Sequence, residues 1–244
     1  MPKLEPYNRR LSYSYALGIF PCMQLLDARP DIVKRLLLHP DGMESEGVKK
    51  LRERCSALGI REETAERVLR RESRKENCFA ALVFDKYEDD LESERSHAVL
   101  CQISDEGNAG TAFRSLLAFG IRDVCLVRPC VDRFDPHVIR ASMGAVFHMR
   151  SRQCENFEDY RRSFPDRELY PFMLTASISL EEAVSRARPP YSLIFGNEAT
   201  GLPEAFSDIG QPVRIPQSPL VDSLNLGVAI SIGTYSFQRA VGGV

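Results

Sequence analysis

From residue 98 onward, short apolar runs alternate with amphipathic stretches, and this alternation restricts the fold more than any other feature of the chain. Predicted strands are 98–103, 123–127, 171–176, 191–195 and 212–215, and predicted helices are 108–119, 135–142, 156–163, 179–187 and 223–240. Such alternation predicts an α/β fold with a mostly parallel sheet that helices cover on both faces. Ligands of open sheets bind beyond the carboxyl ends of the strands, so we look for chemistry in the segments that follow them.

The part of the chain before residue 98 predicts a second, smaller α/β module. Its predicted elements are a helix beginning near Pro21, a strand over 31–39, helices over 45–58 and 61–76, and a buried strand over 79–84. The strip 85–97 is strongly acidic and holds few core-forming residues, which is typical of a linker. We therefore expect domains over 1–84 and 98–244, joined by a linker over 85–97.

The composition argues against several classes of protein. The seven cysteines are scattered and include no C-x-x-C pair, and no histidine lies near them at a metal-ligand spacing, so we expect free thiols and no metal. No apolar run approaches the length of a membrane span, and no signal peptide is evident, so we expect a cytoplasmic protein without membrane contact. Residues 1–84 hold 16 basic and 12 acidic side chains. This excess is a weak indication of a phosphate-bearing partner, and a solvated helix surface explains it about as well.

The segment after the first predicted strand of the second domain opens a helix. Asn108 stands where an N-cap is expected, and Gly110 permits close approach of backbone or ligand. Arg114 lies one and a half turns into the helix, and Gly120 ends it. A capped helix with a surface arginine would show the same residues, so this segment alone does not establish a site.

The segment after the fourth predicted strand reads GNEATGLPEAF (196–206). Two glycines and a Leu-Pro pair predict a tight loop that presents backbone N–H and C=O groups to a ligand. The loop is neither a dinucleotide fingerprint nor a P-loop, because G-x-G-x-x-G and Gly-Lys-Ser/Thr are absent. An ordinary turn remains an alternative for this loop.

The segment after the fifth predicted strand leads into an apolar helix. Asp222 or Ser223 is the expected cap, and Asn225 is expected in the first turn. The helix is apolar on nearly all sides, which indicates burial on more than one side. A core helix explains the apolar positions but not the polar pair Ser223 and Asn225 at its mouth.

Together these segments resemble the signature motifs of the SpoU family, the TrmH-like branch of the SPOUT methyltransferases. The matching residues are Asn108, Gly110, Arg114, Phe119 and Gly120 in the first motif, Gly196, Asn197, Glu198, Gly201 and Leu202 in the second, and Ile215, Pro216, Ser223, Leu224, Asn225, Val228 and Ala229 in the third. The stretch 140–148 is similar to a subsidiary motif, and the resemblance spans about residues 98–240. The family often has Asp-Pro-x-Asn where this chain has Asp-Glu-Gly-Asn (105–108), which puts the rigidity of that turn in doubt.

The resemblance implies a C-terminal trefoil knot that binds S-adenosylmethionine, and a homodimer formed through the C-terminal domain. The implied cofactor-binding residues are Gly196, Asn197, Gly201, Ile215, Leu224 and Ala229, with Ala176 as a weaker candidate. The implied reaction is methylation of a ribose 2′-hydroxyl in tRNA or rRNA, and the front module is loosely similar to the family's substrate-binding domain.

By the same resemblance Arg114 is the central catalytic residue, with Asn108, Glu198, Ser223 and Asn225 orienting it and the ribose. A guanidinium stays protonated in proteins, so a phosphate-gripping role suits Arg114 better than that of a literal base. The basic side chains of helix 61–76 are candidate RNA contacts or simply a solvated face: Arg67, Arg70, Arg71, Arg74 and Lys75. The rival hypotheses are a nucleotide- or NAD-dependent enzyme, disfavoured because its phosphate loop is missing, and an RNA-binding or ribosome-associated protein without turnover.

Overall fold

The computed structural model describes residues 4–73 and 77–243, and its chain divides into two compact units. The first unit runs up to Tyr87 and includes Asp132–His148, whereas the second consists of Glu88–Val131 and the chain from Met149 onward. Asp132–His148 was expected in the second domain, and the structure differs at this point. The reason is tertiary packing, because Phe134 and Phe147 of this segment pack edge-on against Phe84 at centroid distances of 5.7 and 5.2 Å.

The second unit is built on a five-stranded sheet with the order β7-β6-β5-β10-β8, in which every pairing is parallel. Its strands are β5 (His97–Cys101), β6 (Asp123–Val127), β7 (Arg150–Cys154), β8 (Glu168–Pro171) and β10 (Tyr191–Phe195). Its helices are α4 (Glu106–Ala118), α6 (Phe157–Ser163), α7 (Leu180–Arg186), α8 (Leu226–Ala240) and the 3-10 helix η4 (Glu204–Asp208). The parallel α/β sheet that the alternation predicts is therefore confirmed.

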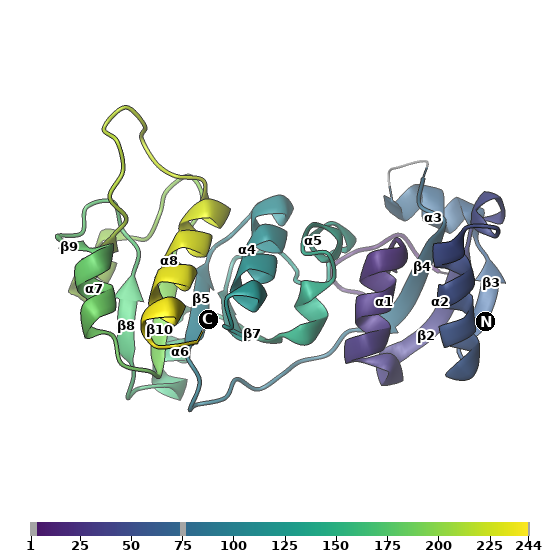
Figure 1. Cartoon of the computed structure of the whole chain (residues 1–244), viewed down its shortest axis with the longest axis horizontal. Helices are drawn as coiled ribbons and strands as arrows, with labels where there is room; N and C mark the ends of the chain where they lie inside the picture. The colour runs from purple at the N-terminus through teal and green to yellow at the C-terminus, as the bar shows by residue number, and fades with distance from the viewer. Residues whose placement is uncertain (1–3, 74–76, 244) are drawn as a thin grey trace. The chain divides into compact units, whose positions relative to one another are not determined.

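Helices cover both faces of this sheet because successive strand residues point to opposite sides. On one face, Val99 and Ile194 form a core with Phe157 and Tyr160 of α6. On the other face, the ring of Tyr191 lies 5.2 Å from that of Phe237 in α8. Helices α4 and α8 also pack against each other, and Figure 1 shows them side by side.

One strand expected in this unit was misplaced, and another forms but lies outside the main sheet. The strand expected at 171–176 ends at Pro171, and Phe172 makes only an isolated bridge to Val213. The strand expected at 212–215 is the short β11 (Val213–Arg214), which pairs with β9 (Ile178–Ser179) in a separate small sheet. As a result, the chain after β8 and the chain around β11 lie together beyond the main sheet.

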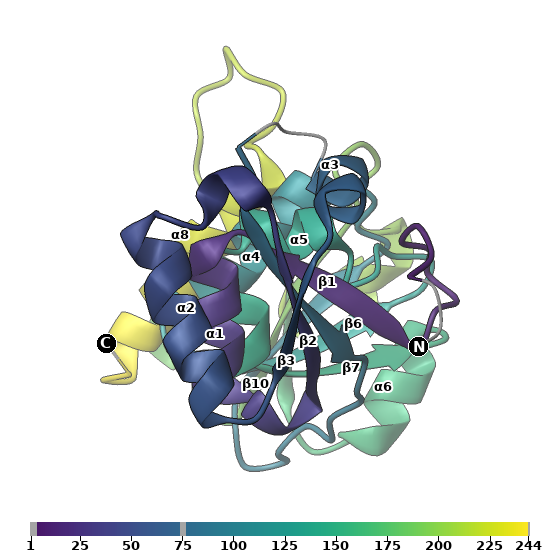
Figure 2. The ribbon, with the colours of Figure 1, turned by 90° about the vertical axis from the view of Figure 1, so that its right-hand side faces the viewer.

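The first unit holds a four-stranded sheet with the order β1-β4-β2-β3, in which only the β2–β3 pairing is parallel. Its strands are β1 (Tyr13–Leu17), β2 (Val33–Leu38), β3 (Arg61–Thr64) and β4 (Ala80–Asp85). Its helices are α1 (Ile19–Ala28), α2 (Glu46–Ala57), α3 (Glu66–Ser73) and α5 (Pro136–Ala141), with 3-10 turns η1 (Pro30–Ile32), η2 (Pro40–Gly42) and η3 (Ala145–His148). Figure 2 shows α1 and α2 packed side by side in this unit.

The helix expected over 61–76 is replaced in its first part by β3. The sequence Arg-Glu-Glu-Thr has little strand propensity, yet pairing with β2 at the sheet edge overrides it. Arg52 of α2 supports this edge through two hydrogen bonds from its guanidinium to the carboxylate of Glu62, at 2.9 and 2.7 Å.

Among the described residues, no helix combines the length and apolar character needed to cross a membrane.

Candidate active site

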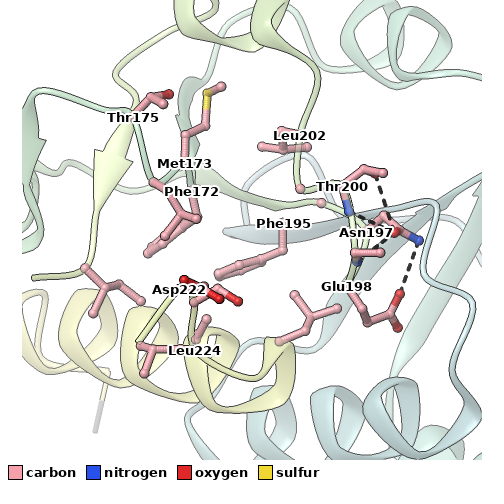
Figure 3. Close-up of a pocket in the computed structure, with 18 of the residues that line it drawn as sticks. Phe172, Met173, Thr175, Phe195, Asn197, Glu198, Thr200, Leu202, Asp222 and Leu224 are labelled. Carbon is pink, nitrogen blue, oxygen red and sulfur yellow. Dashed lines mark hydrogen bonds between the residues drawn. The ribbon is translucent and has the colours of Figure 1, made fainter. Parts of the chain in front are cut away.

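A pocket of about 440 Å³ lies in the second unit beyond the carboxyl ends of β8 and β10 (Figure 3). Its size is within the range of small-molecule sites. Three segments line it, one after each of β8, β10 and β11, and the lining residues are Phe172–Thr175, Phe195–Leu202, Val213, Ile215, Gln217, Asp222, Ser223, Leu224, Leu226 and Ala229. The pocket therefore forms where a parallel sheet is expected to bind its ligand.

The aromatic wall of the pocket comes from Phe172 and Phe195. Their rings stack at a centroid distance of 4.4 Å with an interplanar angle of 23° (Figure 3). Sequence reasoning missed both as site residues, because an apolar residue at a strand end has the same signature as a core residue. Gln217 was missed too, since no motif position marks it.

The loop after β10 is a closed turn that forms one wall of the pocket. Asn197 and Gly201 exchange backbone hydrogen bonds of 3.2 and 2.9 Å. Gly201 has φ +67°, and a Cβ on Gly196 would lie 2.3 Å from the carbonyl carbon of Gly201, so both positions require glycine. The side-chain oxygen of Asn197 accepts hydrogen bonds from the backbone N–H groups of Ala199 (2.9 Å) and Thr200 (3.3 Å), which fixes the turn (Figure 3).

Glu198 ties this turn to the start of α4. Its carboxylate accepts hydrogen bonds from the backbone N–H groups of Ser104 (3.3 Å) and Asp105 (3.2 Å). The side-chain amides of Asn108 (3.4 Å) and Asn197 (3.2 Å) also donate to it. A carboxylate can only accept, and here it gathers donors from two loops that lie far apart in the sequence.

The cap of α4 is Asp105 and not Asn108. The Asp105 carboxylate accepts from the backbone N–H of Asn108 at 2.7 Å, so the helix begins earlier than predicted. Asn108 consequently lies inside the first turn, and its side chain is free to bridge to other elements. Its amide donates to Glu198, and its side-chain oxygen accepts from the amide of Asn225 at 3.0 Å.

The cap of α8 is Asn225, so the expectation of Asp222 or Ser223 was wrong. The Asn225 side-chain oxygen accepts from the backbone N–H of Val228 at 3.3 Å. Asp222 and Ser223 instead lie in the exposed loop before the helix. Glu198, Asn108 and Asn225 therefore form a continuous polar chain, here called the bridging chain, that joins the β10 loop, α4 and α8.

Helices α4 and α8 approach closely next to the bridging chain. A Cβ on Gly227 would lie 2.8 Å from the side chain of Thr111, and the hydroxyls of Ser231 and Ser115 are hydrogen-bonded at 2.7 Å. Arg114 follows Thr111 by three residues and so lies beside this α8-facing row of α4. Its side chain is exposed, and within the described part of the chain it forms neither a hydrogen bond nor an ion pair.

The structure brings most of the predicted site residues together. Six of the seven expected cofactor residues line the pocket, namely Gly196, Asn197, Gly201, Ile215, Leu224 and Ala229, whereas the buried Ala176 does not. Of the expected catalytic residues, Glu198 and Ser223 line it. Asn108 and Asn225 are connected to it through Glu198, and Arg114 lies outside it.

The expected RNA-binding arginines lie partly on α3 of the first unit. Arg70 forms an ion pair with Glu66 at 2.9 Å, and Arg71 forms one with Glu72 at 2.6 Å. Arg67 is exposed and has no ion pair within the described residues, while Arg74 and Lys75 lie outside them. These pairings leave Arg67 as the most available positive charge of the described helix.

Cysteine and histidine side chains form no apparent metal centre in the described residues, where no group of three or more potential ligands is assembled. The seven cysteines, all within the described residues, are buried thiols that form no disulfide. His97 is buried within the second unit and hydrogen-bonds the hydroxyl of Tyr160 (3.0 Å) and the carbonyl oxygen of Glu92 (2.8 Å). Burial, together with the nearby charge of Arg167, lowers the pKa of His97 to about 4.

Comparison with known proteins identifies residues 95–235 as a match to the SpoU rRNA Methylase family. An uncharacterized tRNA/rRNA methyltransferase of Synechocystis is 31% identical over 144 residues, which are 58% of this chain and 52% of that protein. The chain thus spans about half the length of this curated relative. The AdoMet-bound rRNA methyltransferase of Sinorhizobium meliloti has a TM-score of 0.78 at 26% identity, covering 93% of this chain and 87% of that one. A solved RNA 2′-O ribose methyltransferase gives a TM-score of 0.77 at 25% identity over 94% of this chain and 89% of its own.

Proposed function

Because this chain belongs to the SpoU rRNA methylase family, we propose that it transfers the methyl group of S-adenosylmethionine to a ribose 2′-hydroxyl of an RNA. The observation that supports this most is the bridging chain, which connects the pocket at Glu198 with the helix that carries Arg114. The family match includes every residue that lines the pocket. The solved relatives are an AdoMet-bound rRNA methyltransferase and an RNA 2′-O ribose methyltransferase, which agrees with this reaction.

The residues present fit S-adenosylmethionine. The stacked rings of Phe172 and Phe195 suit a flat apolar group such as adenine, and the tight turn that includes Gly196 and Gly201 lines the pocket. The carboxylates of Glu198 and Asp222 line the pocket, and negative charge suits a cofactor that carries a sulfonium and an ammonium. When bound, the cofactor supplies an electrophilic methyl group. Its proposed contacts are Gly196, Asn197, Gly201, Ile215, Leu224 and Ala229, and Ala176 has the least support.

The chain's own part in the reaction is to position and activate the ribose hydroxyl. A neutral hydroxyl is a poor nucleophile, and Arg114 keeps its proton, so we assign Arg114 to the adjacent phosphate and to the negative charge that develops on the oxygen. As the ribose oxygen takes up the methyl group that the bound cofactor would supply, S-adenosylhomocysteine would be left and the hydroxyl proton would pass to the phosphate or to solvent. Glu198, Asn108 and Asn225 hold α4, the helix that carries Arg114, against the pocket, and with Ser223 they are assigned to orienting the ribose.

The proposed substrate is a tRNA or an rRNA, bound in part by the first unit. Phosphate binding requires available positive charge, which Arg67 offers more than Arg70 or Arg71. The roles of Arg74 and Lys75 in RNA binding stay predictions.

Three further properties also stay predictions: the trefoil knot, the cytoplasmic location and the homodimer. For the dimer, the support is an apolar surface on α8, where Val228 and Tyr235 are 46% and 41% exposed. Apolar side chains exposed on one helix suit contact with a second copy of the chain.

Transfer of radiolabelled methyl from S-adenosylmethionine to purified tRNA and rRNA tests the proposal, with Arg114→Ala as the comparison. We expect label in one RNA pool at a linkage that resists alkali, and none with the variant. A variant that binds S-adenosylhomocysteine as the wild type does would place the defect in catalysis. Absence of both cofactor binding and transfer in the wild type would refute the proposed function.

A further inference from the structure

Gln217 presents a buried hydrogen-bond acceptor that no part of the described chain satisfies. The residue lines the pocket, on the loop between β11 and α8. Its amide nitrogen donates to the carbonyl oxygens of Val221 (3.5 Å) and Asp222 (3.2 Å). Its amide oxygen, Oε1, is buried and has no partner among the described residues.

The orientation of this amide follows from its surroundings. Exchanging the nitrogen and oxygen would place the amide oxygen against two carbonyl oxygens, which is an acceptor facing acceptors. The nitrogen must therefore face the loop carbonyls of Val221 and Asp222. Oε1 is then held as an acceptor by a side chain that the loop already fixes.

The other polar side chains of the pocket have partners or contact water. The side-chain oxygen of Asn197 accepts from backbone N–H groups, and Glu198 accepts from four residues. Thr175, Asp222 and Ser223 are exposed, so water can satisfy them. Buried polar atoms in folded proteins nearly always have a partner, and among the described residues that line the pocket the exception is at Gln217, which indicates a ligand donor.

We propose that Oε1 of Gln217 accepts a hydrogen bond from a neutral donor on the adenosine half of the cofactor, and so determines cofactor specificity. The inference rests on the proposed function, since it requires S-adenosylmethionine in this pocket. Neutral donors on that half are the adenine amine and the ribose hydroxyls. The charged ammonium is better matched to the exposed carboxylate of Asp222, which leaves the neutral amide for a neutral donor.

Calorimetric binding of cofactor analogues tests the assignment without relying on turnover. The ligands are S-adenosylhomocysteine, its inosine counterpart, in which a carbonyl oxygen replaces the adenine amine, and its 2′-deoxy and 3′-deoxy counterparts. For wild type, we expect the analogue that lacks the correct donor to bind roughly tenfold more weakly than S-adenosylhomocysteine. The affected analogue distinguishes the amine from a hydroxyl.

The variants Gln217→Met and Gln217→Glu separate specificity from structure. Met has a similar length but removes the amide oxygen. We therefore expect the Gln217→Met variant to bind S-adenosylhomocysteine more weakly than wild type does and to bind all the analogues with similar affinity. Glu retains one acceptor oxygen but sets its other oxygen against the loop carbonyls of Val221 and Asp222, so we expect it to weaken the binding of every ligand and still to bind the analogue without the correct donor most weakly. Thermal unfolding of each variant checks that the fold is intact.

Two results would overturn the assignment, and they differ. If Gln217→Met weakens every ligand by the same factor and preserves discrimination, the side chain only supports the loop. If wild type shows no discrimination among the analogues, Oε1 contacts none of these donors. Failure of wild type to bind S-adenosylhomocysteine at all would instead refute the proposed function, and this inference with it.

Discussion

Replacing Asn225 by aspartate should separate the stability of α8 from the activity of the site. In wild type the Asn225 oxygen caps α8, and its amide donates to Asn108 at 3.0 Å. Aspartate retains the capping oxygen but cannot donate. The Asn108 amide then lies between two carboxylates, that of Glu198 and the one introduced at position 225. Its NH₂ group can donate to only one of them, so its oxygen faces the other, and one acceptor always faces another.

The magnitudes follow from these two contacts. Losing an exposed hydrogen bond costs about 0.5–1.5 kcal/mol, and a carboxylate at a helix N-terminus contributes about 0.3–1 kcal/mol, so the two nearly offset each other. The free energy of unfolding of Asn225→Asp should therefore lie within about 0.5 kcal/mol of the wild-type value. Asn225→Ala loses both the cap and the bridge, which should cost about 1–2 kcal/mol, or about 2–4 °C in Tm for each kcal/mol in a domain of this size.

The assay measures thermal unfolding and methyl transfer for both variants. We expect Asn225→Asp to transfer methyl groups about tenfold more slowly, because the bridging chain no longer holds Asn108 in one orientation. Asn156 provides a matched control, since it caps α6 through the backbone N–H of Asp159 and lies outside the site. Asn156→Asp should keep both stability and activity. A full transfer rate in Asn225→Asp would refute the argument that the bridging chain positions the site.

Four further predictions concern single features of the two units. Arg114→Lys should lower transfer at least tenfold in single-turnover assays with unchanged affinity for S-adenosylhomocysteine, because lysine cannot bind a phosphate in bidentate fashion; near-normal turnover would contradict this. Gly196→Ala should abolish cofactor binding in calorimetry and destabilise the fold by about 1–3 kcal/mol, since its Cβ would overlap the backbone of the same turn. Arg67→Glu should weaken RNA binding and flatten its salt dependence in filter-binding assays more than Arg70→Glu does, because Arg70 is already paired, and equal effects would contradict the ranking. The pKa of His97 in the folded state, about 4, is below that of an unfolded histidine, so protonation favours unfolding. The second unit should therefore lose stability as pH falls from about 6.5 toward 4, and denaturant titrations of the His97→Asn variant should show a smaller loss of unfolding free energy over this range.

The main sheet of the second unit was predictable because its buried strands are continuous apolar runs. The strands that sequence reasoning missed or misassigned include β3 and β7, which are edge strands with the polar sequences REET and RSRQC. An edge strand has one neighbour and is partly exposed, so its composition resembles that of a loop or an exposed helix. Pairing with the adjacent strand, which sequence periodicity does not report, decides these elements.

The site was predictable where its residues belong to recognisable motifs and less so elsewhere. Asn108 and Asn225 were identified as site residues, but the helix caps were misplaced. Asn108 was expected to cap α4, where Asp105 is the cap, and Asp222 or Ser223 was expected to cap α8, where Asn225 is the cap. Asp and Asn cap helices almost equally well, so two such residues close together leave the helix start ambiguous. Gln217 carries no local signal, because its significance depends on which atoms surround its amide.

The return of Asp132–His148 to the first unit has a consequence for anyone who wishes to exchange domains between relatives. The backbone passes from one unit to the other after Tyr87, after Val131 and after His148, so no single cut separates them. Expressing the chain from residue 88 alone would leave Phe134 and Phe147, which are 2% and 1% exposed, without the partner ring of Phe84. A functional chimera must therefore exchange both segments of the first unit, the N-terminal segment and Asp132–His148, at the same time. Substitutions within Asp132–His148 should be matched to the N-terminal segment they pack against, and not to the second unit.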